Sequence, residues 1–281
     1  MPNKPRWWSG ASARAAGAGL PEPEAGLLSD PGCHRQQNED SARIVHNPPA
    51  RGLLLIVADG MGGHEAGEVA SQAAVAVVEK CYRESRGTPG EALAKAFRAA
   101  HRQIFKMAAA NASYAGMGTT CTALALVNGQ AWAAHVGDSR LYLVRGPGIY
   151  QLSEDHTQCM ELVRKGLLTP EQARKHEDRN VLLHAMGTRQ ELTFESWSEP
   201  MPVEPGDCFV LCSDGLHDLV SETEIREVVR GADPETACGK LVAMARDRGG
   251  YDNITVAVAA VAGTADSAPL LKATRPIEVH E

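Results

Sequence analysis

The chain has 281 residues, of which 43% are hydrophobic, and its formal net charge is -7. This length can bury one large core or two small ones, and we expect a single domain. Because the net charge is negative and no basic stripe occurs, the sequence argues against a nucleic-acid binder. The seven cysteines lack CxxC spacing, which favours reduced core thiols in a cytoplasmic protein over disulfides or a zinc site.

Two compositionally biased segments flank the expected domain. Residues 1–27 are rich in Pro, Gly and Ala, and residues 262–281 are polar without periodicity. We therefore expect a weakly ordered arm and a weakly ordered tail around one domain at 28–261. Arg14 interrupts any apolar core of a secretion signal, and no apolar stretch reaches the length of a membrane span. These features predict a cytoplasmic protein without a membrane-spanning segment.

The first half of the domain predicts a buried strand, two helices and a hairpin. The strand and the two helices, recognised by an apolar run and by helical spacing of apolar residues, are expected at 53–58, 67–84 and 91–110. Two further strand-like runs, 120–127 and 130–136, are separated only by Asn128 and Gly129. An Asn-Gly pair between two such runs is typical of a two-residue hairpin turn, so this pairing is expected to be antiparallel.

The second half of the domain continues the mixture of strands and helices. Strands are expected at 141–145, 149–152, 207–213 and 254–261, and helices at 222–230 and 234–248. Mixed elements with hairpins favour an α+β domain, in which helices cover antiparallel sheets, over a doubly wound parallel sheet.

A glycine-rich junction, VADGMGGHEAGEVAS at 57–71, follows the first predicted strand and leads into a helix. It lacks the lysine of a Walker A loop, because His64 follows the glycine pair. A carboxylate stands where a dinucleotide pyrophosphate would approach. Met61 occupies the place of the second aspartate of haloacid-dehalogenase-like phosphatases. A metal site remains, in which Asp59 ends the strand and the Gly60 carbonyl offers a second oxygen ligand.

Acidic residues recur beside the strand-like runs. They lie in QQNED, HVGDSR, VLCSDGLHD and YDNITVAVA, at 36–40, 135–140, 210–218 and 251–259. Each segment alone could be a turn, but together they predict strand ends that converge on one acidic pocket. Two carboxylates about 4 Å apart repel by roughly 4 kcal/mol at an effective dielectric near 20, so a counter-charge is needed. Because Lys and Arg are absent from the DGMGGH, SDG and DN segments, we expect Mn²⁺ or Mg²⁺.

Eight short motifs follow one another along the chain: RQQNED, VADGMGGHEAGEVAS, GMGTTCTALAL, AHVGDSRLYLVR, LSEDHT, RNVLLHAMG, LCSDGLHDLV and DNITVAV. In this order they resemble the metal-dependent serine/threonine protein phosphatases of type 2C, the PPM family, in their bacterial form. The resemblance covers nearly all of 28–261. It implies an α+β fold built as a four-layer α/β/β/α sandwich, with two central antiparallel sheets flanked by helices.

The resemblance also implies which residues bind metal. Asp59 would bridge two Mn²⁺ or Mg²⁺ ions, and the Gly60 carbonyl would contact one of them. Asp214 of the SDG motif and Asp252 of the DN motif would complete the coordination of the other ion.

Four further residues receive roles from the same resemblance. Glu39 and Asp40 would lie beside the metals, mostly through bound water. Arg35 would bind the substrate phosphate, which suits its planar fork of donors; the alternative is a solvated surface charge. Asp138 of GDSR resembles the position of a third, weaker metal in bacterial members, and a simple turn is the alternative there.

The activity implied by the resemblance is hydrolysis of phosphoserine and phosphothreonine in proteins, opposing a bacterial serine/threonine kinase. A water shared by two cations attacks phosphorus in line with the leaving oxygen, and no phosphoenzyme forms. One alternative is a catalytically silent relative that binds phosphoproteins as a regulatory module, although the complete set of metal aspartates favours an enzyme. Another is a nuclease or small-molecule phosphatase with two metals; the negative charge weighs against the nuclease.

Histidines give no clear general acid in this sequence. Met61 stands where several eukaryotic members have a histidine, and His64 could either donate through water or pack at a helix start. For His156 we expect a structural role, because Ser153 and Asp155 resemble signals for a helix N-terminus.

Two segments each allow two interpretations. Residues 159–187 contain two short amphipathic pieces and resemble the flap beside the metal site of bacterial relatives, but could equally be a solvated face. Trp7 and Trp8 could anchor a partner or pack on the domain.

Overall fold

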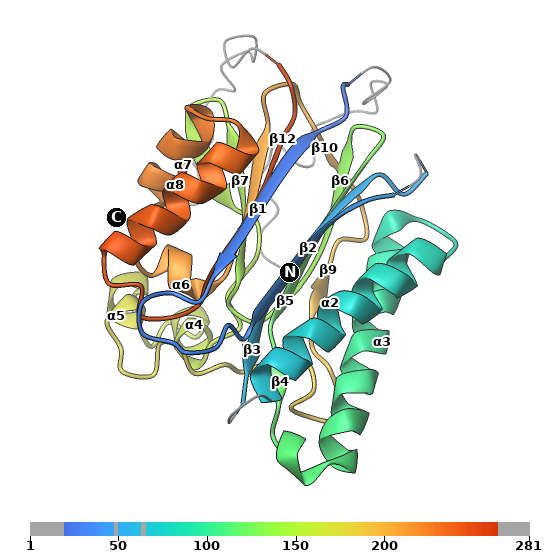
Figure 1. Cartoon of the computed structure of the whole chain (residues 1–281), viewed down its shortest axis with the longest axis vertical. Helices are drawn as coiled ribbons and strands as arrows, with labels where there is room; N and C mark the ends of the chain where they lie inside the picture. The colour runs from blue at the N-terminus through green and yellow to red at the C-terminus, as the bar shows by residue number, and fades with distance from the viewer. Residues whose placement is uncertain (1–19, 48–49, 63–65, 264–281) are drawn as a thin grey trace.

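The computed structural model describes residues 20–47, 50–62 and 66–263 (Figure 1). Most of the predicted N-terminal arm and C-terminal tail lies outside the described residues. The same is true of Trp7 and Trp8.

Two antiparallel sheets form the centre of the molecule. The first contains, in spatial order, β1 (Glu24–Asp30), β12 (Ile254–Ala260), β11 (Cys208–Cys212), β7 (Arg140–Arg145) and β8 (Gly148–Gln151). The second contains β10 (Met201–Pro202), β6 (Gln130–Val136), β5 (Cys121–Val127), β3 (Leu53–Met61) and β2 (Asp40–His46), with β4 (Gly118–Thr119) beside β3 and β9 (Glu195–Ser196) beside β6. All strand pairings between these elements are antiparallel.

Helices cover the outer face of each sheet (Figure 1). The helices on the sheet of β3 are α2 (Ala66–Glu84) and α3 (Pro89–Ala110), and those on the sheet of β12 are α7 (Glu222–Arg230) and α8 (Pro234–Asp247). Shorter elements are η1 (Ala112–Tyr114), α4 (Gln158–Arg164), α5 (Pro170–Arg174) and α6 (Asp214–His217). The order helix, sheet, sheet, helix confirms the predicted four-layer α/β/β/α sandwich.

Strand β3 shows how the layers are joined. Leu54 and Ile56 pack with α2 and α3, whereas Leu55 and Val57 pack in the core between the two sheets. A third core lies between the other sheet and α7 and α8. Because both faces of β3 are buried, its sequence is a continuous apolar run rather than an alternating one.

The predicted hairpin between β5 and β6 is present. Val127 pairs with Gln130, and the two turn residues, Asn128 and Gly129, have φ angles of 51° and 70°. Asn and Gly adopt this left-handed conformation more readily than other residues, which matches the twist of the flanking strands. The other predicted helices and strands are also present, with ends shifted by a few residues.

The predicted boundary between arm and domain is wrong. Strand β1 begins at Glu24, inside the segment 1–27 that we expected to be weakly ordered, and it pairs with β12 along its whole length. Its Gly26 lies against the start of α8, where an added Cβ would come within 2.5 Å of the Glu235 nitrogen. Strand β2 was also missed. Strand β1 pairs with a segment more than 200 residues away, whereas β2 pairs with the next strand, β3; neither contains a continuous apolar run.

Two other predictions concern the cysteines and membrane-spanning segments. All seven cysteines lie in the described residues, none forms a disulfide, and five are buried. Across the described part of the chain, no helix has both the length and the apolar character needed to cross a bilayer.

Candidate metal centre

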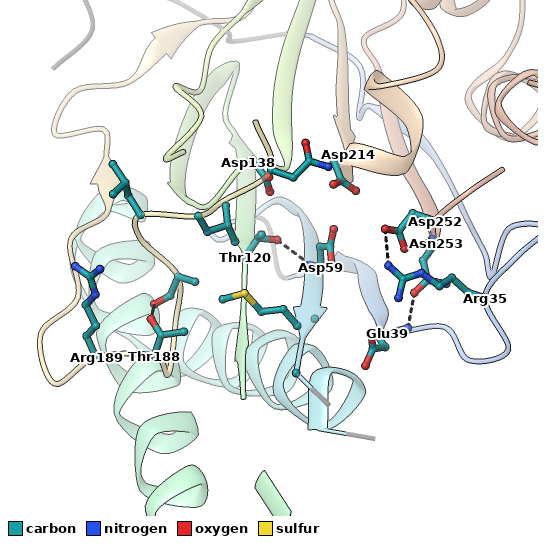
Figure 2. Close-up of a pocket in the computed structure, with 17 residues that line it drawn as sticks. Arg35, Glu39, Asp59, Thr120, Asp138, Thr188, Arg189, Asp214, Asp252 and Asn253 are labelled. Carbon is teal, nitrogen blue, oxygen red and sulfur yellow. Dashed lines mark hydrogen bonds and ion pairs between the residues drawn. The ribbon is translucent and has the colours of Figure 1, made fainter. Parts of the chain in front are cut away.

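Acidic side chains from both sheets converge on one cavity of about 530 Å³ (Figure 2). They are Glu39, Asp59, Asp138, Asp214 and Asp252. Asp59 lies near the end of β3, Asp138 follows β6, Asp214 follows β11, and Asp252 precedes β12. These four positions lie at the same end of the two sheets, so the structure brings these predicted ligands together.

The backbone of Asp59 is fixed by two threonines of the GMGTT segment. The Asp59 N–H donates to Thr120 Oγ1 at 2.8 Å, and its carbonyl accepts from the Thr120 N–H at 2.9 Å. Thr119 Oγ1 also donates to this carbonyl at 2.8 Å. The GMGTT motif by itself did not indicate this role. The threonines hold the end of β3 so that the Asp59 carboxylate faces the cavity.

Gly60 lies where two backbone segments meet. A Cβ added to it would be 2.1 Å from the Gly67 carbonyl oxygen and 2.5 Å from the Glu39 carbonyl oxygen. The Gly60 N–H also donates a hydrogen bond to the Glu39 backbone carbonyl at 3.1 Å. Only glycine fits this approach of α2 and the Glu39 loop to β3.

Replacing Gly60 with alanine is therefore expected to lower the free energy of unfolding by about 2 kcal/mol, because the new methyl group overpacks a buried backbone contact. Thermal or urea denaturation of the metal-free protein measures this change. Gly239→Ala is the matched control, since nothing lies within 4 Å of its Cβ position in α8. A helix-interior alanine is expected to raise stability there by about 0.5 kcal/mol. Equal effects at the two glycines would contradict the packing explanation.

Asp40 lies beneath the cavity rather than in its lining. It is the cross-strand partner of Asp59 and is only 8% exposed. Its Oδ2 accepts a hydrogen bond from Ser213 Oγ at 2.8 Å, and Ser213 Oγ in turn accepts one from the Thr255 N–H at 3.0 Å. Ser213 was not predicted as a site residue, although it is part of the SDG motif.

Arg35 and Glu39 come from one loop at the rim of the cavity. Arg35 donates to Asp252 Oδ2 at 2.8 Å, and its side chain is 49% exposed. Buried Asn253 fixes the loop: its Oδ1 accepts from the Glu39 N–H, and its Nδ2 donates to the carbonyls of Pro31 and Gln37. Sequence reasoning assigned Asp252 but missed the anchoring role of the neighbouring asparagine.

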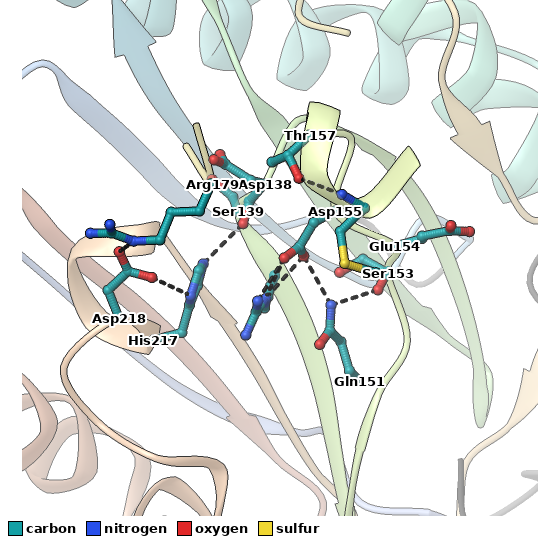
Figure 3. Close-up of polar contacts among 12 residues, drawn as sticks. Asp138, Ser139, Gln151, Ser153, Glu154, Asp155, Thr157, Arg179, His217 and Asp218 are labelled. Carbon is teal, nitrogen blue, oxygen red and sulfur yellow. Dashed lines mark hydrogen bonds and ion pairs between the residues drawn. The ribbon is translucent and has the colours of Figure 1, made fainter. Parts of the chain in front are cut away.

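Asp138 lies at the other side of the cavity within a polar network (Figure 3). Its carbonyl accepts a hydrogen bond from His217 Nε2 at 3.0 Å. His217 Nδ1 lies 3.5 Å from Asp218 Oδ1, and Arg179 Nε lies 4.0 Å from Asp218 Oδ2. These contacts join the loop of Asp138 to α6 and to the segment that follows α5.

His156 has a structural role, as predicted, but for a different reason. Its Nδ1 accepts from the Gly137 N–H at 3.2 Å, which supports the loop before Asp138. The expected helix signals were wrong, because α4 is capped by Thr157. Asp155 instead forms a bidentate ion pair with Arg140 of β7.

Crowding of buried acids raises their pKa values. Burial, followed by repulsion from neighbouring carboxylates, raises the pKa of Asp59 and of Asp138 well above the ordinary value. Burial raises the pKa of Asp40 to about 7 even though hydrogen bonds from Thr255 and Ser213 act in the opposite direction. Burial also raises the pKa of Asp214. The site thus requires protons or cations to neutralise it.

Comparison with known proteins identifies the family of this chain. A family model described as protein phosphatase 2C matches residues 34–244. The chain belongs to the protein phosphatase 2C family. Protein phosphatase PhpP of Streptococcus pneumoniae is 37% identical over 240 residues, which cover 84% of this chain and 96% of that protein. Serine/threonine phosphatase stp of Listeria monocytogenes is 36% identical over 240 residues, which cover 83% of this chain and 93% of that protein.

Solved structures of phosphatase 2C relatives share the fold. The Mycobacterium tuberculosis serine/threonine phosphatase PstP/Ppp superimposes with a TM-score of 0.77 at 35% identity, covering 86% of this chain and 99% of that chain. The catalytic domain of PstP in complex with two manganese ions gives a TM-score of 0.75 at 35% identity, with the same coverage of both chains.

The donor atoms of the cavity suit the divalent cations of a phosphatase 2C enzyme. Asp40 Oδ1 and Asp214 Oδ1 are buried and have no hydrogen-bond partner among the described residues. A buried carboxylate oxygen without a partner is costly, and a hard cation satisfies it directly, as for Asp214, or through a bound water, as for Asp40. The other predicted ligands, Asp59, Asp252 and the Gly60 carbonyl, also offer oxygen. This donor set fits Mn²⁺ or Mg²⁺ better than zinc.

The ligands do not already form a tight cage. In the part of the chain that the structure describes, no three His, Cys, Asp or Glu side chains are arranged as a ready metal-binding group. Arg35 Nη2 lies 2.8 Å from Asp252 Oδ2, so one of the predicted ligands forms an ion pair within the chain. The shared cavity and the unpartnered oxygens therefore support a metal site more strongly than the mutual spacing of the side chains does.

The predicted flap segment forms one wall of the cavity. It contains two short helices, α4 and α5, in agreement with the two amphipathic pieces, and it contributes Leu182, Leu183 and Ala185 to the lining. Met61 also lines the cavity and has no proton to donate, while His64 lies outside the described residues.

Proposed function

We propose that this chain is a metal-dependent protein phosphatase that hydrolyses phosphoserine and phosphothreonine in proteins and so opposes a bacterial serine/threonine kinase. The observation that carries the proposal is the convergence of the predicted acidic ligands on one cavity that has Arg35 at its rim. Family membership supports the same activity, because similar proteins are named as protein or serine/threonine phosphatases.

We assign two divalent cations, Mn²⁺ or Mg²⁺, to the cavity. Asp59, the Gly60 carbonyl, Asp214 and Asp252 would hold these ions. When bound, the cations lower the pKa of a water molecule and neutralise charge on the phosphoryl oxygens. The fixed end of β3 and the loop held by Asn253 keep these ligands in place.

Three other acids have supporting roles in the proposal. Glu39 and Asp40 act mostly through water, since Glu39 lies at the rim and Asp40 lies beneath the floor. Asp138 is assigned to a third, weaker cation at the opposite side of the cavity. Titration of Mn²⁺ into the metal-free protein by calorimetry tests the number of ions bound.

Arg35 is assigned to the substrate phosphate. Its guanidinium has a fork of donors that matches two phosphoryl oxygens, and half of its side chain is exposed to an approaching substrate. The ion pair with Asp252 is accessible to solvent, so its contribution to stability is small. A phosphate can therefore engage the remaining guanidinium donors without a large loss of folding free energy.

Replacing Arg35 with glutamine is expected to lower kcat/KM for a phosphothreonine peptide by about 10- to 100-fold, because a charge-assisted hydrogen bond contributes about 1.5–3 kcal/mol. Arg35→Lys is expected to recover part of this loss, since lysine keeps the charge but not the fork. Arg102→Gln, at an exposed position of α3 away from the cavity, is the control. An unchanged kcat/KM in Arg35→Gln would leave Arg35 as an ordinary surface charge.

Phosphate release tests the activity as a whole. The full chain is assayed with phosphoserine and phosphothreonine peptides and with p-nitrophenyl phosphate, in Mn²⁺, in Mg²⁺ and in EDTA. We expect turnover of the phosphopeptides that requires a divalent cation. A folded protein that is inert with every substrate would support a silent phosphoprotein-binding module. Turnover of p-nitrophenyl phosphate alone would support a small-molecule phosphatase.

The kinase partner and the cytoplasmic location stay predictions. Comparing phosphorylated proteins in cells with and without this chain tests the location. We expect the serine and threonine sites whose phosphorylation rises in its absence to lie mainly in cytoplasmic proteins. An increase confined to exported proteins would contradict the expected location.

A further inference from the structure

A second arginine, Arg189, lines the cavity. Figure 2 shows it on one side of Asp59, with Arg35 on the other side. Arg35 is engaged with Asp252, whereas Arg189 has no hydrogen bond or ion pair among the described residues. The pKa of His184 is lowered mainly by burial and by His156, and the positive charge of Arg189 lowers it further. Arg189 is thus a cation in the cavity wall whose charge the described residues do not balance.

The backbone before Arg189 is tied to the metal centre. The Met186 N–H donates to the Thr119 carbonyl at 2.9 Å, and the Thr119 N–H donates to the Met186 carbonyl at 3.1 Å. Thr119 Oγ1 donates to the carbonyl of Asp59 at 2.8 Å. One residue of β4 therefore connects the Arg189 segment to the end of β3.

The backbone on both sides of Arg189 is held by His101 of α3. The Gly187 N–H donates to His101 Nδ1 at 3.2 Å, and His101 Nε2 lies 3.3 Å from the Gln190 carbonyl. A neutral imidazole with its proton on Nε2 satisfies both contacts at once. His101 is only 4% exposed, and Gly187, with φ of 86°, leaves no room for a Cβ beside Ile104. Arg189 thus extends from a fixed backbone position at the cavity wall.

Arg189 is exposed, so an anion from outside the chain can reach it. The neighbouring lining residues from the same segment are uncharged: Asn180, Leu182, Leu183, Ala185 and Thr188. The acids of the cavity, Glu39, Asp59, Asp138, Asp214 and Asp252, come from other segments, and the cations and the substrate phosphate are assigned to them and to Arg35. A peptide that places its phosphorylated side chain at these groups carries its flanking residues over the walls. An anionic flanking group there would meet Arg189.

We propose that Arg189 is a specificity-determining residue, which binds an anionic group on a residue that flanks the phosphoserine or phosphothreonine of the substrate. A carboxylate and a second phosphate share the required chemistry, because both accept bidentate hydrogen bonds from a guanidinium. The proposal rests on the proposed phosphatase function and adds a substrate class to it: phosphoproteins with a nearby acidic or phosphorylated side chain.

Matched phosphothreonine peptides test this substrate preference. One flanking position is changed to glutamate, to a second phosphothreonine, to glutamine or to lysine, and that position is moved along either side of the phosphothreonine. We expect the wild type to favour an anionic residue at one or two positions, mainly through a lower KM. At those positions Arg189→Gln is expected to reduce the ratio of kcat/KM between anionic and glutamine peptides by about fivefold, as for a partly exposed ion pair.

Two control variants separate charge recognition from structural damage. Arg189→Lys is expected to restore part of the preference, and Arg102→Gln on α3 is expected to leave it intact. The glutamate and second-phosphate peptides show which anion the site favours. The proposal is overturned if no position favours an anion in the wild type, or if Arg189→Gln lowers kcat/KM equally for anionic and glutamine peptides.

Peptide binding keeps this test separate from the test of catalysis. Turnover of the glutamine peptide and of p-nitrophenyl phosphate by the wild type reports on the proposed phosphatase function. If the wild type is inert, fluorescence anisotropy with labelled peptides still measures the preference in wild type and Arg189→Gln. Equal affinities of the two proteins for anionic and glutamine peptides would reject the role of Arg189 irrespective of catalysis.

Discussion

Replacing Asp59 with asparagine is expected to lower Mn²⁺-dependent turnover of a phosphopeptide by about a thousand-fold. The substitution keeps the shape of the side chain but removes the charge of an assigned metal ligand. Charge stabilisation by a bound cation contributes several kcal/mol to such a reaction, and about 1.4 kcal/mol corresponds to a tenfold change in rate. Steady-state phosphate release measures the loss, and calorimetric titration with Mn²⁺ is expected to show weaker binding.

The same substitution is expected to leave the metal-free protein folded and more stable. Asp59 is buried, and repulsion from Asp40 and Asp214 contributes to its raised pKa, so a neutral side chain relieves an unfavourable charge. The threonine contacts of Asp59 use its backbone and are retained. Asp247→Asn, at the exposed end of α8, is the control. Wild-type turnover in Asp59→Asn would remove this residue from the catalytic centre.

The metal-free protein is expected to lose stability as the pH rises from about 6.5 to 8. The pKa of Asp40 is raised to about 7, and those of Asp59 and Asp138 are raised well above the ordinary value. An acid with a raised folded pKa stabilises the protein below its unfolded pKa, and this contribution is lost as pH rises through the folded pKa. Each proton that the folded protein holds and that is released on unfolding lowers the free energy of unfolding by about 1.4 kcal/mol per pH unit, so a fall in Tm of about 5 °C is expected.

Scanning calorimetry in EDTA and in Mn²⁺ tests this pH dependence. Buried His135, whose pKa is lowered to about 4, acts in the opposite direction, but mainly below about pH 6.5. Mn²⁺ binds the deprotonated acids, so it is expected to raise Tm more at pH 8 than at pH 6.5. Asp40→Asn is expected to flatten the EDTA profile. A metal-free Tm that rises over this pH range would contradict the assigned pKa shifts.

Local patterns in the sequence predicted most of the layered fold. The buried strand β3 was visible as an apolar run, and α2 and α3 were visible as apolar residues at helical spacing. The Asn128-Gly129 turn was visible because few residue pairs adopt its backbone conformation without strain. Each of these signals is contained in a short window, where side-chain burial and backbone preference act on neighbouring residues.

Strand β1 was not visible in that way. Residues 24–30 have no regular alternation of buried and exposed positions, and their strand conformation depends on pairing with β12, more than 200 residues away. The predicted boundary at residue 27 failed for this reason. A segment whose backbone partner is distant carries little local information about its own structure.

In the candidate site too, some features follow from the sequence and others only from the folded structure. The sequence alone determined the identity of its acids, since aspartates beside several strand ends need a common counter-charge and their order matches one enzyme family. Only the tertiary structure decided how they are held: by Thr120 on Asp59, by Ser213 on Asp40 and by Asn253 on the rim loop. It also decided that His101 fixes the segment of Arg189 in the cavity wall. Motifs specify chemical groups, whereas hydrogen bonds between segments 61 to 214 residues apart exist only after the chain has folded.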